Sequence, residues 1–211
     1  MPTKTFFNLS QAKQQRLLKA ARQEFSRVPL YDASINKIIA TAGIPRGSFY
    51  QYFKDKTDLY YYYFEKLNQE HKNLWLKTLR DNHGDLFISF RQYFSRLIGE
   101  ITAGQDAPFY RNLFLNMSYK NGHKMSFASH QAHHDREFYS LVDTSCLRIT
   151  SEYELKMLMR ILMATVFQTL GSYYFRQQQG QKVSVTQLKH EFTRTLDWLE
   201  HGIAVRPANQ H

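Results

Sequence analysis

Between Ile38 and Leu59 the sequence reads IIATAGIPRGSFYQYFKDKTDL, and its residue types predict two short helices separated by a sharp turn. Apolar residues before the turn recur at helical spacing, and Gly43 suits the left-handed backbone conformation that ends a helix. Pro45 suits a first helical position, because the missing proline N–H has no intrahelical partner there. We therefore expect one helix to end at Gly43 and the next to begin near Pro45.

Helical patterns continue on both sides of this turn. A supporting helix is predicted over about 10–27, where small and apolar residues form one stripe and basic residues face water. Asp32 or Ser34 can accept the free N–H groups at the start of the first short helix. Asp55 is placed to cap a long helix that reaches about residue 80.

The rest of the sequence carries helical periodicity, punctuated by a few Pro and Gly residues. Further helices are predicted over 86–101, 109–117, 126–144, 152–178 and 185–203. The 152–178 segment is apolar on nearly every side, so it must be covered by its own body and by another surface, most simply a partner subunit. The predicted fold class is all-α.

Positive charge is concentrated at the N-terminal end of the chain. Residues 1–56 hold ten Lys and Arg against three acidic residues, a net charge of +7, whereas the other 155 residues have a net charge of only +3. Such an excess makes a polyanion a plausible partner. A two-helix turn whose second helix can enter a major groove is typical of DNA-binding proteins, but many ordinary helical hairpins share the pattern.

The run from Ile38 to Leu59, together with Leu17-Leu18-Lys19-Ala20-Ala21 and Phe25, closely resembles the signature of TetR-family regulators. In that family an I-A-x-x-A-G-V segment leads into a small recognition helix that ends Y-x-Y/H-F, and a lysine opens the next helix. The resemblance covers roughly residues 10–60. Pro45 departs from it, because the family more often has Ser or Thr there, which removes one capping or phosphate-contacting hydroxyl.

The resemblance implies a helix-turn-helix DNA-binding domain over 1–56 and a helical ligand-binding and dimerisation domain over 57–211. It also implies a ligand-responsive regulator, expected to be a repressor that leaves its operator when a small molecule binds. A single short recognition helix touches few base pairs. We therefore expect a homodimer, paired through the helices near 152–178 and 185–203, on a palindromic double-stranded DNA operator.

Two sets of side chains are expected to contact DNA, because phosphate contacts position a protein and base-edge contacts specify sequence. The phosphate set is Ser34, Lys37, Tyr50, Tyr52 and Lys56. Lys56 would place its ammonium beside free N–H groups at a helix start, where anions are favoured. For Tyr50 and Tyr52 the alternative is that one ring packs into a small core beside Phe49 and Phe53.

The base-reading set is Arg46, Gly47, Ser48 and Gln51, with Asn36 as a weaker member. Arg46 is suited to a bidentate pair with guanine and Gln51 to one with adenine, whereas Gly47 permits close approach. Arg46 can instead contact a phosphate or stay solvated, and Asn36 can instead cap its helix. The core of this unit is predicted to contain Ile38, Ile39, Ala42, Ile44, Phe49 and Phe53.

Aromatic residues are frequent between residues 60 and 175, and at helical spacing they are usually ordinary core. The TetR resemblance implies a cavity among these helices, and an apolar or aromatic small molecule is then the expected effector. The candidate lining residues are Trp75, Phe90, Phe94, Phe114, Phe138 and Met163.

Other chemistries are disfavoured. The sequence has no Gly-rich phosphate loop, G-x-S-x-G elbow or zinc signature, so we expect no enzyme, no cofactor and no catalytic residue. His130 and His134 have the i, i+4 spacing of a metal chelate, near His123 and His133. A polar helix face is the preferred interpretation, so no metal is expected. The alternative function is a helical carrier of apolar ligands that does not bind DNA.

The sequence also bears on the compartment. Cys146 is its single cysteine, which excludes an intramolecular disulfide and fits a reducing environment. It contains neither a run of about 18 uncharged apolar residues nor a signal-peptide core, so neither a membrane partner nor secretion is expected. We expect a cytoplasmic protein.

Overall fold

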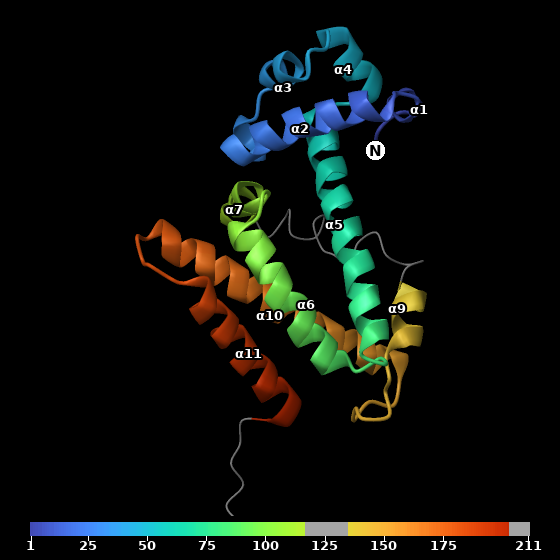
Figure 1. Cartoon of the computed structure of the whole chain (residues 1–211), viewed down its shortest axis with the longest axis vertical. Helices are drawn as coiled ribbons and strands as arrows, with labels where there is room; N and C mark the ends of the chain where they lie inside the picture. The colour runs from blue at the N-terminus through green and yellow to red at the C-terminus, as the bar shows by residue number, and fades with distance from the viewer. Residues whose placement is uncertain (117–134, 203–211) are drawn as a thin grey trace, which may run out of the picture. The chain divides into compact units, whose positions relative to one another are not determined.

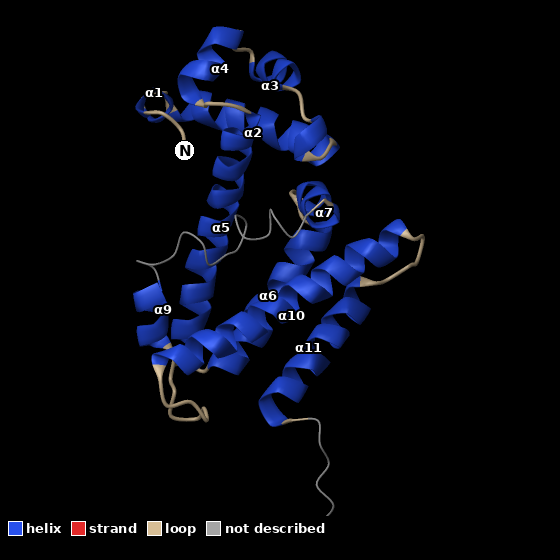
Figure 2. Ribbon diagram, turned by 180° about the vertical axis from the view of Figure 1, so that it is seen from behind, coloured by secondary structure: helices blue, strands red, loops and turns tan. Residues whose placement is uncertain are grey.

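The computed structural model describes residues 1–116 and 135–202, which form helices joined by loops (Figure 1). The elements are α1 (Lys4–Phe7), α2 (Gln11–Arg27), the 3-10 helix η1 (Leu30–Asp32), α3 (Ile35–Ala42), α4 (Arg46–Tyr52), α5 (Lys56–Asp81), α6 (Leu86–Ala103), α7 (Ala107–Leu115), α9 (Asp135–Leu141), α10 (Glu152–Gln178) and α11 (Val185–His201). Figure 2 contains no strand in this part of the chain, which confirms the all-helical prediction. None of these helices is both long and apolar enough to cross a membrane.

The chain divides into two compact units. The first holds Met1–Leu74 and the stretch that starts at Glu100 and includes α7; the second holds Trp75–Gly99 with α9, α10 and α11. The predicted domains 1–56 and 57–211 were defined by expected role, whereas these units are defined by contacts. Helix α7 and the first part of α5 therefore belong to the same unit as the helix-turn-helix.

The turn residues of the first unit largely follow the sequence prediction. Gly43 ends α3 with φ 62° and ψ 42°, and the Asp55 carboxylate accepts a hydrogen bond of 2.8 Å from the Asp58 N–H. Pro45 is the N-cap of α4 rather than its first helical residue. Of the two residues predicted to cap α3, Asp32 and Ser34, the Ser34 side chain makes no capping hydrogen bond. The Ser34 N–H instead donates to the carboxylate of Glu24 on α2.

The core of the first unit is formed by one face of each of its short helices. The α2 stripe packs against α3 and also against α7. Four of the six predicted core residues are buried, namely Ile38, Ala42, Phe49 and Phe53. Ile39 and Ile44 are half-buried. The prediction thus identified the inward face of each helix but assigned too many residues to it.

Helix α1 was not predicted, although its Phe6 is fully buried. The Phe6 ring lies 4.9 Å from that of Phe53 and 5.3 Å from that of Tyr62, centroid to centroid. The Thr3 N–H donates to the Tyr52 carbonyl at 2.9 Å, so the N-terminal segment contacts the end of α4. A four-residue helix is too short to show periodicity, which explains the omission.

In the second unit α10 occupies its predicted range, whereas α11 ends at His201 rather than at 203. Three apolar residues of α11 are buried, namely Leu188, Phe192 and Leu196, whereas Leu199 is exposed. Arg176 of α10 forms a bidentate pair with the Glu191 carboxylate of α11 at 2.7 and 3.2 Å. Apolar packing and this ion pair therefore both hold the two helices together.

The helix predicted over 126–144 is only partly covered, since 117–134 lie outside the described residues. Its described end, α9, stops at Leu141 rather than at 144. Just after it, the Asp143 N–H donates to the Gly84 carbonyl at 3.0 Å. The Asp143 N–H is therefore bonded to the turn between α5 and α6 and not to a carbonyl of α9.

Replacing Gly84 with alanine is expected to destabilise the fold more than the same change at Gly180. Both glycines have left-handed φ angles, +85° and +80°, so both variants carry strain of about 1–2 kcal/mol. Only at Gly84 would the new Cβ lie under 3.0 Å from backbone atoms, those of Leu141 and Asp143, which adds roughly 1–3 kcal/mol. Urea unfolding measures both losses, and equal losses would contradict this close approach.

Candidate nucleic-acid interface

Helices α3 and α4 form the helix-turn-helix, and both lie along the same side of α2 (Figure 1). The exposed members of the predicted DNA-contact sets are Asn36, Lys37, Arg46, Gly47, Tyr50 and Gln51. The half-buried members are Ser34, Ser48, Tyr52 and Lys56. The fold therefore leaves most of the predicted contact residues accessible on two adjacent helices.

Arg46 is held by side chains from both of these helices. Its Nη1 donates to Asn36 Oδ1 at 2.5 Å and its Nη2 lies 3.4 Å from the Tyr50 hydroxyl. The guanidinium also lies 5.8 Å from the centroid of the Tyr50 ring. Asn36 thus links α3 to α4 through Arg46, a role that differs from the capping alternative.

The two tyrosines of α4 differ in their surroundings. Tyr50 is exposed beside Arg46, with its ring 5.4 Å from that of Phe49. Tyr52 is half-buried, and its ring lies 6.4 Å from that of Phe6 on α1. The core-packing alternative therefore describes Tyr52 better than Tyr50.

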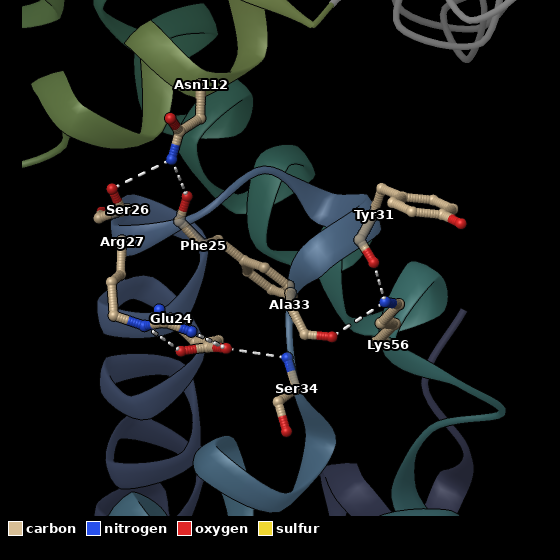
Figure 3. A network of polar contacts seen from close by, with 9 residues as sticks. All are labelled: Glu24, Phe25, Ser26, Arg27, Tyr31, Ala33, Ser34, Lys56 and Asn112. Atoms are coloured by element: carbon tan, nitrogen blue, oxygen red, sulfur yellow. Dashed lines mark hydrogen bonds and ion pairs between the residues drawn. The ribbon is translucent and has the colours of Figure 1, made fainter.

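Lys56, the first residue of α5, uses its ammonium within the protein (Figure 3). Its Nζ donates to the carbonyl oxygens of Tyr31 at 2.5 Å and Ala33 at 2.9 Å. Two of its three donors thus hold the connection between α2 and α3. The contact of Lys56 with a DNA phosphate stays a prediction, and it would use the third N–H donor of the ammonium.

Glu24 is a site residue that the sequence analysis missed. Its buried carboxylate accepts from the Ser34 N–H at 2.8 Å and, in a fork, from Arg27 at 2.8 and 2.9 Å (Figure 3). The bonds from Arg27 hold the pKa of Glu24 below its ordinary value of 4.5, helped by the Ser34 N–H and against the effect of burial. The i, i+3 spacing of Glu24 and Arg27 was the available signal.

Changing Glu24 to glutamine is expected to cost about 1–3 kcal/mol at pH 7, because charge-assisted hydrogen bonds are lost. The folded-state pKa is lowered, so the carboxylate stabilises the fold above pH 4.5. That stability is lost as the pH falls from 4.5 through the folded-state value. Urea unfolding from pH 7 to pH 3 should therefore bring the two proteins together. The control is Glu65→Gln at an exposed position, and a pH-independent gap at Glu24 would contradict the assignment.

Asn112 of α7 is a second missed residue at this end of α2. Its Nδ2 donates to the carbonyl oxygens of Phe25 at 2.9 Å and Ser26 at 3.0 Å (Figure 3). Carbonyls in the last turn of a helix have no intrahelical partner, so a side-chain donor suits them. No local pattern in the sequence predicts a contact between residues this far apart.

Polar contacts also join α7 and the turn before it to α5. The Tyr63 hydroxyl donates to the Asp106 carboxylate, and burial raises the pKa of Tyr63. His71 Nε2 lies 3.0 Å from the Tyr110 hydroxyl, and the Glu100 carboxylate is 3.8 Å from His71 Nδ1. Burial lowers the pKa of His71 below 6.5, although Glu100 opposes this. Burial therefore favours the neutral form of this ring.

Four of the predicted effector-contact residues come together in the second unit. The Trp75 ring lies 5.7 Å from Phe90, 6.3 Å from Phe94 and 6.0 Å from Phe138, centroid to centroid. Phe90 and Phe94 also approach Phe192 of α11. These rings contact one another, and their predicted contact with an effector stays a prediction.

The other two predicted effector-contact residues are not part of this aromatic cluster. Phe114 belongs to the first unit, and Met163 is half-buried on α10. The histidines weighed as metal ligands, His123, His130, His133 and His134, lie outside the described residues.

An acidic cluster on α11 contains Asp197 and Glu200, with His201 nearby. Arg91 of α6 pairs with both carboxylates. The Arg91 guanidinium therefore already offsets negative charge on the Asp197 and Glu200 carboxylates.

Comparisons with known proteins bear on both halves of the chain. A family model described as "Bacterial regulatory proteins, tetR family" matches residues 17–64. A second, described as "Tetracyclin repressor-like, C-terminal domain", matches residues 85–203, more than half of the chain. The first match contains the helix-turn-helix, and the second contains α6, α7, α9, α10 and α11.

Solved structures with a similar fold include the transcriptional regulator FadR of Bacillus subtilis, in complex with stearoyl-CoA. It is 14% identical, with a TM-score of 0.63 over 90% of this chain and 99% of that one. A TetR-like transcriptional regulator from Rhodococcus sp. RHA1 is 19% identical, with a TM-score of 0.52 over 90% and 97%. At these identities the likeness shows a shared fold.

Proposed function

Because the chain belongs to the TetR family of bacterial regulatory proteins, we propose that it is a repressor that binds a palindromic operator as a homodimer. The proposed effector is an apolar or aromatic small molecule that releases the protein from DNA in the cytoplasm. The observation that carries the DNA-binding part is the joined set Asn36, Arg46 and Tyr50, exposed on two adjacent helices. The proposal contains no catalytic step.

The proposed division of roles on DNA follows the exposure of the side chains. Arg46 and Gln51 read base edges from α4, with Gly47, Ser48 and Asn36 close to the same groove. Lys37 and Tyr50 are exposed and suited to phosphates, and Ser34, Tyr52 and Lys56 are proposed to add contacts at the rim. The net charge of +7 over residues 1–56 supports attraction to this polyanion.

The proposed dimer contact is centred on α10, with α11 beside it. Tyr153, Met157 and Ile161 are exposed at four-residue spacing, so they lie on one face of α10. Phe175 is exposed further along α10, and Trp198 is exposed on α11. Large apolar side chains exposed along one face of a helix support an interaction site, and a second copy of the chain would bury the same set twice.

The proposed effector is supported by the helical body and by the fold it shares with a stearoyl-CoA-bound regulator. The aromatic cluster of Trp75, Phe90, Phe94 and Phe138 is the proposed binding region, with Phe114 and Met163 as outlying members. An effector acts only if it binds one conformation more tightly than another. Helix α5 is suited to transmit this preference, since it starts at Lys56 in the first unit and ends at Asp81 in the second.

The test is selection of a binding sequence from random double-stranded DNA by the full chain, followed by mobility shift with non-specific competitor at two salt concentrations. The expected result is a palindromic consensus, two subunits per DNA and binding that weakens steeply with salt. Stearoyl-CoA and coenzyme A alone are then compared for loss of the shift. Binding that competitor abolishes for every sequence would overturn the operator and favour the carrier of apolar ligands.

A further inference from the structure

Helix α7 belongs by sequence to the C-terminal family match, but it packs against a helix that lies largely within the N-terminal match. It lies within residues 85–203, which match the C-terminal family model, but it packs against α2, which lies largely within the N-terminal match over 17–64. Both helices belong to the first compact unit. A segment of the effector-binding sequence is therefore built directly into the structure that carries the helix-turn-helix.

Asn112 adds a polar contact to the packing of α7 against α2, and it binds main-chain atoms. Its Nδ2 bridges the carbonyls of Phe25 and Ser26, in the last turn of α2 (Figure 3). Phe25 is fully buried, so the end of α2 is also anchored in the core. Loss of Asn112 leaves both carbonyls without this donor.

The same turn of α2 is bonded to the start of α3. Glu24, next to Phe25 in the chain, accepts the Ser34 N–H at the N-cap of α3. Lys56 holds the carbonyls of Tyr31 and Ala33 in the connection between the two helices. A displacement at the end of α2 must therefore move α3 or break these hydrogen bonds.

Further partners of α7 lie on α5. His71 of α5 meets Tyr110, and Tyr63 of α5 donates to Asp106 at the N-cap of α7. Helix α7 is thus held by α5 and in turn holds α2. Its position depends on a helix that continues into the second unit.

We propose that Asn112 is a positioning residue for DNA binding, through which α7 fixes the end of α2 and, by way of Glu24, the orientation of α3 and α4. The inference rests on the proposed DNA-binding function but needs no identified effector. Energetic coupling between sites is reciprocal. DNA bound at α3 and α4 must therefore act back on α7 if Asn112 couples them.

The test is amide hydrogen exchange of the full chain with and without its selected operator. In the natural protein, operator should slow exchange in α7 as well as in the α2–α3 region. In Asn112→Leu, of similar volume but without a donor, the slowing should be lost in α7 and kept in α3. Operator binding should weaken by at least roughly fivefold, the low end of usual coupling between sites.

The matched control is Asn116→Leu at the C-cap of the same helix. Asn116 also donates its Nδ2 to a main-chain carbonyl, but that carbonyl belongs to Asn112 within α7 itself. The control should keep the operator-induced slowing in α7. Asn112→Ala serves as a second variant should the leucine disturb folding.

The outcomes distinguish failure of the positioning role of Asn112 from failure of the proposed DNA binding. An α7 response that persists in both Asn112 variants overturns the inference and leaves the regulator intact, as does a natural protein that binds operator with no change in α7. If no sequence is selected at all, the proposed DNA binding itself fails. A loss of stability alone, without loss of the α7 response, assigns Asn112 a purely structural role and also overturns the inference.

Discussion

Arg46→Ala is expected to weaken operator binding by roughly 2–6 kcal/mol, because a homodimer would lose one base contact worth roughly 1–3 kcal/mol in each half-site. The guanidinium is already oriented by Asn36 and Tyr50, so little side-chain freedom remains to be lost on binding. The measurement is operator affinity by mobility shift, together with a new sequence selection. The selection should lose preference at one base pair per half-site.

Arg46→Lys separates base reading from phosphate attraction, because lysine keeps the charge but lacks the planar fork. If Arg46 reads guanine, the lysine variant should lose the same base preference as the alanine variant while keeping the salt dependence. If Arg46 only contacts phosphate, lysine should restore binding, and alanine should reduce the salt slope by about one per subunit. That second result would contradict the base-reading role.

Asn36→Ala provides a further check on this arrangement. Asn36 acts on Arg46 in the free protein, so the two substitutions should be non-additive in operator affinity. Additive losses would mean that the contact between α3 and α4 does not persist on DNA.

Ile161→Glu is expected to produce a monomer at micromolar concentration and to abolish cooperative operator binding. Ile161 is 48% exposed in the single chain and lies between Met157 and Thr165 on the outer face of α10. In the proposed dimer each copy would bury a carboxylate, at roughly 3–5 kcal/mol per uncompensated charge. Sedimentation equilibrium measures the assembly, and mobility shift measures the DNA binding.

Ile88→Glu is the matched control, since Ile88 is 44% exposed on α6, a helix outside the proposed dimer contact. It introduces the same charge at a similar exposure and should leave both assembly and operator binding unchanged. A dimer that survives Ile161→Glu would place the interface elsewhere. A monomer that still binds operator with full affinity would contradict the need for two subunits.

Local features of the first 60 residues were predictable because their signals are local. Gly43 has the backbone freedom that its turn uses, and the Asp55 carboxylate caps α5 within three residues. The helical period identified α6, α10 and α11 because each runs for several turns. Short-range stereochemistry is enough to specify these elements.

Features that depend on tertiary contact were missed. Phe6 is buried against residues about 50 positions away, and Asn112 is 87 residues from Phe25. Lys56 was assigned to phosphate from its place at a helix start, whereas folding brings two carbonyls to its ammonium. A single sequence carries no period or spacing that reports such encounters.

The three side chains that fix the α2–α3 connection all reach main-chain groups there: Glu24 an amide, Lys56 two carbonyls and Asn112 two carbonyls. Main-chain groups are the same whatever residue carries them. These hydrogen bonds therefore do not depend on which side chains the connection carries, and Tyr31 is 89% exposed. Substitutions at such positions can accumulate over evolutionary time while the scaffold that presents the recognition helix is inherited unchanged.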